Sequence, residues 1–428
     1  MTNWPVATVL FGAFGLLLAL GAPIALALGV SALLAIVCFD PGHLEVVPQT
    51  LLAATRVWDL LAIPLFVLAG HIMARSAMAR RLIDLAECFT GPLPGGVGQA
   101  LIVASIFLAG ISGSGPADVA VLGTLAVGPM VMRGYPKGTA AALAAVCGGI
   151  GIIVPPSIAL IIYGVVAGAS IPKLFLAGVV PGFFLGGVLM VTLAVRVRGR
   201  IGRTSFPGWR QAGLSFVRAL WGLLFPVIIL GGIYGSIFTP TESAAVAAVY
   251  AVLVSRLVYR DLDWRGLYRS LVDSVSVTAV VMLIVACARL FARVLDDAFI
   301  TDDLARLLTS LTTDRYLLLL LVNGGLLVAG CFMDAISIFY IFVPIVAPVL
   351  QAAGVDLVHL GVVMTVNLAI GQVTPPVGVN LYVSAGVTGC DLHQINREAL
   401  PFVAAGVLAL MVITYCPWLS LALPQLLN

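Results

Sequence analysis

Residues with potential for chemistry gather where two long apolar runs are interrupted. One stretch runs from Gly371 to Tyr382 and reads G-Q-V-T-P-P-V-G-V-N-L-Y. It lies inside an apolar run from about 360 to 387, which is longer than the roughly 20 residues that a membrane-spanning helix needs. Pro375 and Pro376 remove two backbone donors and clash with the preceding turn, so we expect the helix to break there. Because unwound carbonyls in hydrocarbon are costly unless protein, water or an ion satisfies them, the sequence predicts a polar site.

The same pattern occurs earlier in the chain, from Gly149 to Ser157, around Pro155 and Pro156. This stretch breaks an apolar run at about 138–167 and offers free carbonyls from about Gly149 to Pro155. Unwound carbonyls and the C-terminal ends of half-helices suit Na⁺, whereas the N-terminal ends of half-helices suit a carboxylate. We therefore expect cation and anion sites at both breaks.

A third polar stretch, Ser112-Gly-Ser-Gly-Pro-Ala-Asp118, interrupts the apolar run from Leu101 to Met132. Each side holds only about 16 residues, which is short for a full span. We interpret residues 97–132 as a re-entrant hairpin whose tip presents hydroxyls, amides and carbonyls at mid-membrane. The alternative is that these small residues only allow helices to pack closely.

Two acidic residues stand within apolar segments. Asp334 lies between the apolar stretches 316–331 and 335–351, and acidic residues in such places are costly and usually functional. An aspartate in an interfacial loop is the alternative. Asp118 either contributes to the site or caps the second arm of the first hairpin, and the sequence leaves both open.

The sequence contains no motif for a metal site, a disulfide framework, a nucleotide-binding loop or a catalytic serine. The four histidines (His43, His71, His359, His393) are isolated, and the seven cysteines are dispersed without a C-x-x-C pair, so neither a metal site nor a disulfide framework is indicated. We find no nucleotide-binding loop and no G-x-S-x-G elbow. Residues 239–242 form a helix-capping box, with threonine at N-cap, proline at N1 and glutamate at N3. We therefore predict neither an enzyme nor a cofactor.

The composition requires a membrane environment for these sites. The 428 residues are 61% hydrophobic and 10% charged, whereas soluble domains contain about 25% charged residues. The chain is therefore predicted to be an all-α polytopic membrane protein with a single membrane domain over 1–428. The net charge of +3 comes from scattered loop arginines and does not indicate nucleic acid. The N-terminus lacks a basic n-region, so we expect the first apolar run to remain as a helix.

The apolar runs predict this order of elements. Full spans are expected at about 4–20, 23–39, 60–77, 174–195, 218–237, 241–259, 273–295 and 399–423, with charged arms after residues 75 and 295. The hairpins fall at about 97–132 and 315–351, and the broken helices at about 138–167 and 359–387.

The two halves of the chain register at a single constant offset. When the two proline pairs are superimposed, Gly110 falls on Gly330, Ser114 on Asp334, and Gly151 on Gly371. Residues 1–210 and 211–428 are therefore expected to be repeats of about five crossings each. An odd number of crossings makes the repeats inverted, as in many secondary transporters.

Charge distribution predicts the orientation. Most basic loops fall on one side and the acidic loops on the other, so the positive-inside rule places both termini in the periplasm. The first hairpin then enters from the cytoplasm and the second from outside. Four arginines run against this bias without reversing it: Arg289, Arg293, Arg306 and Arg315.

Over nearly its whole length the sequence resembles the large, DctM-like membrane subunit of the TRAP (tripartite ATP-independent periplasmic) transporters. The resemblance is carried by I-P-L-F-V-L-A-G at 63–70 with A-R-R-L at 79–82, G-I-S-G-S-G at 110–115 with A-D at 117–118, P-P-S at 155–157, F-T-P-T-E-S at 238–243 and T-P-P-V-G at 374–378. The pair Gly115-Pro116 departs from the family pattern, which often has a serine and a small or branched residue there.

The resemblance implies a Na⁺-coupled, elevator-type importer of organic acids in the bacterial inner membrane. It also implies a separate four-helix small subunit and a periplasmic substrate-binding protein. One Na⁺ is expected between the first hairpin tip and the first break, and another between the second tip and second break. The implied ion-binding residues are Ser112, Gly113, Gly149, Gly151, Val154, Gly330, Asp334, Gly371, Thr374 and Pro375. The implied substrate-binding residues are Ser112, Ser114, Ser157 and Asp334.

Two alternatives remain. A stand-alone ion-coupled carboxylate carrier of similar design would need no binding protein. A channel would need a continuous polar stripe, and a membrane enzyme an acid–base or metal constellation, and we see neither pattern. The sequence does not identify the organic acid: C4-dicarboxylates, sialic or uronic acids and keto acids all remain possible.

Overall fold

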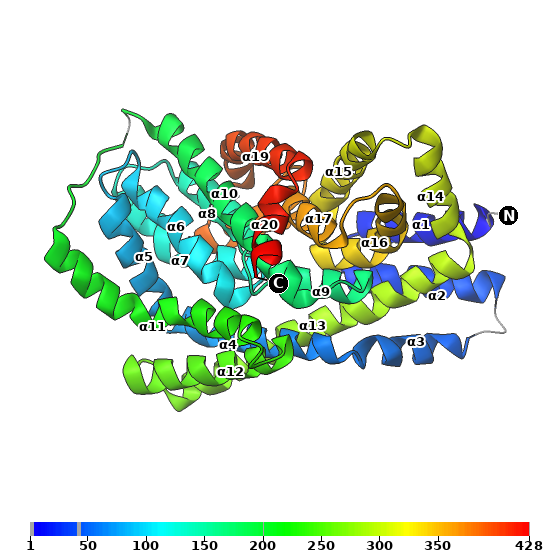
Figure 1. Cartoon of the computed structure of the whole chain (residues 1–428), viewed down its shortest axis with the longest axis horizontal. Helices are drawn as coiled ribbons and strands as arrows, with labels where there is room; N and C mark the ends of the chain where they lie inside the picture. Colours follow the sequence, from blue (N-terminus) through cyan, green and yellow to red (C-terminus); the bar gives the residue numbers. More distant parts are fainter. Residues whose placement is uncertain (1–3, 41–43, 200, 428) are drawn as a thin grey trace.

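The computed structural model is all-helical over the residues it describes, 4–40, 44–199 and 201–427, with the side chains of 110–112 also left undescribed. Figure 1 shows an elongated body in which α11, α12, α13 and α3 run along one long edge. Within the described ranges, nine helices are long and apolar enough to cross a membrane. The chain is therefore a polytopic helical membrane protein, as predicted.

The first half follows the predicted order closely, and a short helix, α3, lies in the segment after the second span. Its helices are α1 (Trp4–Ala19), α2 (Ile24–Phe39), α3 (Val46–Thr55), the 3₁₀ turn η2 (Trp58–Leu61), α4 (Ala62–Arg75), α5 (Met78–Thr90), α6 (Gly96–Ser112), α7 (Gly115–Met132), α8 (Lys137–Ile150), α9 (Ile158–Ala167) and α10 (Ile171–Val197).

The second half repeats this order. Its helices are α11 (Trp209–Tyr234), α12 (Pro240–Leu253), the π-turn η3 (Val254–Val258), α13 (Trp264–Asp297), α14 (Ile300–Leu311), α15 (Arg315–Phe332), α16 (Ala335–Ala352), α17 (Leu357–Gly371), α18 (Val379–Thr388), α19 (Leu392–Tyr415) and α20 (Trp418–Leu426). The predicted capping box is present, with the Thr239 hydroxyl accepting from Glu242 N and the Glu242 carboxylate accepting from Thr239 N.

Four predicted boundaries were wrong. The final span does not run from 399 to 423: α19 runs from Leu392 to Tyr415, and α20 begins at Trp418. Pro417 cannot continue a helix and forces Cys416 out of the helical region, where φ is −120° and ψ is 77°. Helices α11 and α13 begin at Trp209 and Trp264, ahead of the predicted 218 and 273, because polar and charged residues extend an apolar helix beyond the membrane.

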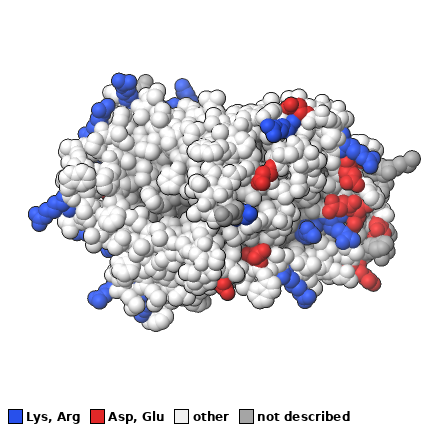
Figure 2. Space-filling view, viewed as in Figure 1, with Lys and Arg blue, Asp and Glu red and all other residues white. Residues whose placement is uncertain are grey.

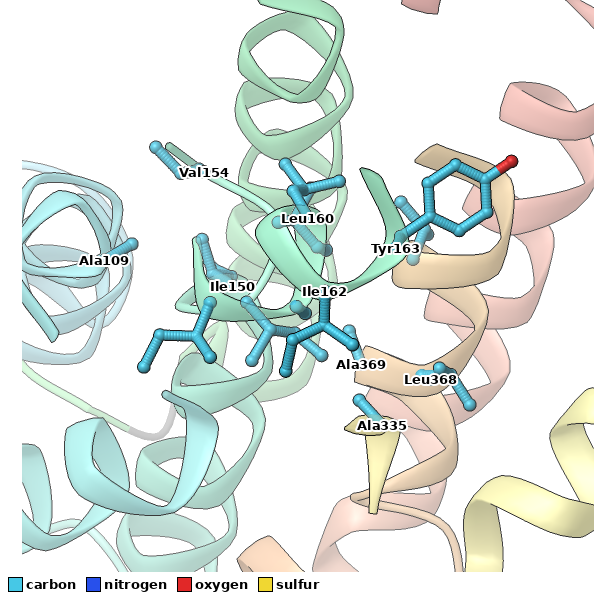
Figure 3. Close-up of a cluster of buried hydrophobic side chains, with 14 of the residues drawn as sticks. Ala109, Ile150, Val154, Leu160, Ile162, Tyr163, Ala335, Leu368 and Ala369 are labelled. Carbon is cyan, nitrogen blue, oxygen red and sulfur yellow. The ribbon is translucent and has the colours of Figure 1, made fainter. Parts of the chain in front are cut away.

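The broken helices form the centre of the molecule. Every residue of α8 from Gly138 to Ile150 and of α17 from His359 to Gly371 is buried. Figure 3 shows Ile150 and Leu160, which flank the first break, in the same cluster as Leu368 and Ala369 of α17. Large apolar side chains are exposed on the peripheral helices α1, α2, α11 and α13, as expected for helices that face lipid.

Helix boundaries recur in the predicted register. When the proline pairs are superimposed, the start of α7 at Gly115 falls on the start of α16 at Ala335. The start of α8 at Lys137 likewise falls on the start of α17 at Leu357. Both second arms therefore start directly after a hairpin tip, and both broken helices follow a short turn. The inverted orientation of the two repeats, 1–210 and 211–428, stays a prediction.

Candidate functional site

The first hairpin tip lies against the first break. Gly113 ends α6 in the left-handed region, at φ 59°, and its carbonyl accepts a hydrogen bond of 3.3 Å from Ile158 N. A Cβ added to Gly113 would lie 3.0 Å from the carbonyl oxygen of Pro156. Only glycine allows both this backbone conformation and this approach. The structure thus brings together two of the segments that the sequence assigned to one Na⁺ site.

The break itself is a tight, hydrogen-bonded turn. Gly151 N donates to Gly148 O at 3.0 Å, and Ile153 N donates to Ile150 O at 3.0 Å. Gly149 lies against α17, because an added Cβ would be 2.9 Å from Ala369 O. The Val154 side chain packs instead toward Gly182 of α10. Of the predicted ion-binding residues here, Gly113 contacts the end of the break at Pro156, whereas Gly149 faces α17 and Gly151 faces Asp118 of α7.

The predicted serines differ in their surroundings. Ser157 is fully buried and is the N-cap of α9: its hydroxyl donates to Ile152 O and accepts from Leu160 N at 3.3 Å. Ser114 is the N-cap residue of α7, half-buried, and lines a cavity of about 330 Å³ with Gly70 and His71 of α4. The side chain of Ser112 lies outside the described residues.

The second hairpin tip meets the second break in a corresponding way. A Cβ added to Gly371 would lie 2.8 Å from the Cα of Gly330. Gly378 N donates to Cys331 O at 3.0 Å, which ties the turn after the break to the tip. Thr374 is half-buried, and its hydroxyl donates to Ile370 O at 2.7 Å. The neighbouring Pro375 is also half-buried.

Asp334 is the N-cap of α16 and is partly buried. Its carboxylate accepts from Ile336 N at 2.9 Å, Ser337 N at 3.3 Å and the Ser337 hydroxyl at 2.5 Å. Three donors and the positive end of the helix dipole stabilise a negative charge at this tip. The structure thus gives Asp334 a helix-capping role that we had not predicted for it, and its substrate role stays a prediction.

The position of Asp118 is compatible with both roles that the sequence left open, as part of the site and as a cap of the second hairpin arm. It is 4% exposed in the first turn of α7, where a carboxylate suits the helix dipole. An added Cβ on Gly151 would fall 1.8 Å from its Oδ2 atom. The carboxylate therefore touches the first break as well as belonging to the start of α7.

Sequence reasoning missed two amides beside the first hairpin. Gln372 and Asn380 flank the second break and are at most 5% exposed. A Cβ added to Gly115 would lie 2.7 Å from Gln372 Oε1 and 3.1 Å from Asn380 Nδ2. The space at Gly115 is thus occupied by side chains of the other half, which explains a glycine where we noted a departure from the family pattern.

A second missed feature is a buried polar network among α15, α17 and α19. Asn367 Nδ2 donates to the Asn323 backbone oxygen and to Asn323 Oδ1, both at 2.9 Å. Asn323 Nδ2 donates to the Thr414 hydroxyl at 3.0 Å, and His359 Nε2 lies 3.2 Å from Thr414 O. Single polar residues inside apolar spans were the signal that could have identified these positions.

The two breaks belong to one packed body. Ser384 of α18 donates to Ala141 O of α8 at 2.7 Å, and Asn380 Nδ2 lies 3.4 Å from Ala145 O. The Tyr163 hydroxyl of α9 donates to Leu357 O of α17 at 2.7 Å. The two hairpin-and-break sites are therefore held in a fixed relation to each other.

The fold of the chain has a counterpart among solved structures. It is similar to the crystal structure of the Alcanivorax borkumensis YdaH transporter, with a TM-score of 0.62 over 89% of each chain at 14% sequence identity. At that identity the likeness concerns the fold alone.

The sequence then identifies the family. Residues 11–419 match the family model of the tripartite ATP-independent periplasmic transporter, DctM component. The chain therefore belongs to the DctM family of TRAP transporter large permeases, as its motifs predicted. Members of this family are transporter permeases and not enzymes.

Three named permeases are similar to this chain over most of its length. The C4-dicarboxylate TRAP transporter large permease protein DctM of Pseudomonas aeruginosa is 42% identical over 94% of each chain. The sialic acid TRAP transporter large permease protein SiaM of Vibrio cholerae is 36% identical over 97% of this chain and 98% of its own. The isethionate TRAP transporter permease protein DctMQ of Oleidesulfovibrio alaskensis is 41% identical over 96% of this chain. The present chain spans 65% of the length of that relative.

Proposed function

We propose that this protein is the large membrane subunit of a Na⁺-coupled importer of organic acids that works by an elevator mechanism. The observation that carries the proposal is the pair of hairpin tips packed against unwound helices, Gly113 on Pro156 and Gly330 on Gly371. Tips and breaks supply backbone carbonyls beside the ends of half-helices, which is the chemistry that secondary transporters use for Na⁺ and carboxylates.

We assign one Na⁺ to each junction between a hairpin tip and the break against which it packs. Ser112, Gly113, Gly149, Gly151 and Val154 would hold one Na⁺. Gly330, Asp334, Gly371, Thr374 and Pro375 would hold the other. Ser112, Ser114, Ser157 and Asp334 are the proposed substrate-binding residues, and no further cofactor is required.

The moving body would comprise both hairpins and both broken helices, that is α6–α9 and α15–α18. The contacts between α8, α9, α17 and α18 support this assignment, because they would keep both sites together during a displacement. Helices α11, α12 and α13, whose outer faces are apolar and exposed, would form part of the static scaffold.

We infer an assembly of three proteins in the bacterial inner membrane. A separate four-helix small subunit would brace the scaffold, and a periplasmic binding protein would deliver the acid to a chain with both termini in the periplasm. Membership of a tripartite transporter family supports the three components. The names of the relatives point to carboxylates or sulfonates as substrates: C4-dicarboxylate, sialic acid and isethionate.

Uptake into proteoliposomes tests the proposal. The chain and its small subunit are reconstituted together, and succinate, sialic acid and isethionate are offered as radiolabelled substrates. Each assay is run with and without an inward Na⁺ gradient and the binding protein. We expect uptake that requires both. Uptake without Na⁺ would contradict the coupling, and Na⁺-driven uptake without the binding protein would favour the stand-alone carrier.

A further inference from the structure

A pocket of about 310 Å³ opens between α3, α9, α13 and α16. Its charged lining comes from one face of α13, where Arg289, Arg293, Asp296 and Asp297 follow one another at helical spacing. Thr50 of α3 and Tyr340 of α16 line the opposite walls. A second pocket, of about 350 Å³, adjoins it and shares Arg293 and Asp297. In Figure 2, charges of both signs gather at the end where Figure 1 places α2 and α14.

The arginines of this pocket are two of the four that oppose the positive-inside rule. Three of these four have visible partners: Arg293 pairs with Asp297 at 2.7 Å, Arg306 lies 3.9 Å from Asp303, and Arg315 lies over the ring of Tyr316. Arg289 makes no ion pair or hydrogen bond with any residue that the structure describes. Its guanidinium shares the pocket with Asp296 and Asp297 but forms an ion pair with neither, so it is available for an external anion.

The remaining charges of the pocket are already engaged. Asp297 is neutralised by Arg293, and Asp296 accepts a hydrogen bond of 2.8 Å from the Thr301 hydroxyl. The lining thus contains two arginines and two aspartates, and its formal charges cancel. Such a pocket attracts an anion at one point without a strong overall field, so an anion that enters can also leave.

The position of the pocket connects it with the proposed transport path. Tyr340 lies on α16 six residues after Asp334, which is about 9 Å along a helix. Arg289 belongs to α13 in the proposed scaffold, while Tyr340 and Val166 belong to elements of the proposed moving body. The walls of the pocket would therefore separate when the moving body shifts.

We propose that this pocket is a carboxylate-binding station on the substrate path, where Arg289 pairs with a carboxylate of the arriving organic acid. Guanidinium binds carboxylate through two parallel hydrogen bonds, which orients the anion as well as attracting it. The inference rests on the proposed function, because it assumes an organic acid as cargo. Displacement of the moving body would open the pocket and release the acid toward the second hairpin tip.

The test compares the Km for succinate uptake, in the presence of Na⁺ and the binding protein, among the parent protein, Arg289→Gln, Arg289→Lys and Arg306→Gln. Arg306 is the matched control, because its side chain is 81% exposed and it lies outside the pocket. We expect Arg289→Gln to raise the Km about tenfold, the usual effect of losing a charged hydrogen bond. Arg289→Lys should fall between the two, because it retains the charge and loses the planar fork. The Na⁺ concentration for half-maximal uptake should not change.

Other outcomes would overturn the proposal. A parental Km in Arg289→Gln, or an equal rise in Arg306→Gln, would mean that no specific pairing occurs. An Arg289→Gln effect that appears in vesicles with phosphatidylglycerol and vanishes in pure phosphatidylcholine would assign the arginine to a lipid headgroup. A weakened affinity of the binding protein for Arg289→Gln would assign it to docking of that partner. Na⁺-independent uptake by the parent protein would instead count against the proposed function.

Discussion

Glycines determine how closely each hairpin tip approaches its break. At the second junction, Gly330 and Gly371 meet backbone to backbone, so no side chain can yield if one residue gains a methyl group. At the first junction, Gly113 faces the carbonyl of Pro156 in the same manner. Because the proposed ligands are carbonyls, a shift of a few tenths of an ångström should change the affinity for Na⁺ directly.

We predict that Gly371→Ala strongly reduces Na⁺-driven uptake. Its Cβ would lie 2.8 Å from Gly330 Cα and 3.0 Å from Gly330 C, which forces the tip and the break apart. Overpacking of this kind costs about 1–3 kcal/mol. The Na⁺ concentration for half-maximal uptake should rise, and dose–response curves measure it.

Gly386→Ala is the control for this substitution. Gly386 lies on α18 with no heavy atom within 4 Å of an added Cβ. The same methyl group should leave uptake unchanged there. Equal losses in both variants would show that the contact between Gly330 and Gly371 has no special role.

Asp334 provides a second test at this scale. Asparagine is a good N-cap and retains a side-chain oxygen for Ile336 N, so Asp334→Asn should fold normally while losing the negative charge. We expect a large fall in Na⁺-driven uptake with little change in thermal stability. Ser337→Ala, which removes only one donor to the carboxylate, should have a small effect. Full activity of Asp334→Asn would exclude a role for the charge.

Among the elements, the interface between α15 and α17 is held by two kinds of contact, a close approach of glycines and a pair of hydrogen bonds. Gly330 and Gly371 meet near the hairpin tip. Asn323, about two turns before Gly330, and Asn367, about one turn before Gly371, are joined by two hydrogen bonds. In the register that superimposes the proline pairs, the corresponding positions of the first half are Val103 and Cys147, which are apolar or weakly polar. The hydrogen-bonded pair of asparagines is therefore specific to the second half.

Removing one member of this network should destabilise the protein. Asn367→Ala deletes both donors to Asn323 in a fully buried position, which we expect to cost about 1–3 kcal/mol. Fluorescence-detected thermal unfolding in detergent should show a lower midpoint. Cys147→Ala at the matching buried position of α8 should lower the midpoint much less. Similar midpoints for both variants would mean that the network adds no stability.

Element boundaries were predictable where proline, glycine or charge interrupts an apolar run. The proline pairs located both breaks, and the helices α6 and α7 run from Gly96 to Met132, where the hairpin was expected. The re-entrant placement of this hairpin in the membrane stays a prediction. The end of α19 was missed, although Pro417 is a visible breaker, because the apolar run continues past it.

Contacts between elements were not predictable from one sequence. The sequence shows that Asn323, Asn367 and Arg289 are polar residues in apolar surroundings, but not which helix faces meet. Asn323 and Asn367 pair only because α15 packs on α17, and Arg289 has a pocket only because α3, α9 and α16 converge on α13. The capping bonds of Ser157 likewise depend on the geometry of the turn that it closes.

On the scale of the whole molecule, both candidate ion sites lie in one body, held by bonds between α8 and α18 and between α9 and α17. Such a body suits an elevator, since substrate and ions would move together without being separated. Exposed apolar faces on α1, α2, α11 and α13 leave the periphery available to lipid and to the proposed small subunit.

The most direct test of the central claim is the simultaneous uptake of ²²Na⁺ and a ¹⁴C-labelled organic acid into proteoliposomes with the binding protein present. The account predicts that each label enters only when both are supplied, and that Gly371→Ala reduces both fluxes in parallel. Entry of the acid without any accompanying ²²Na⁺ would contradict the account.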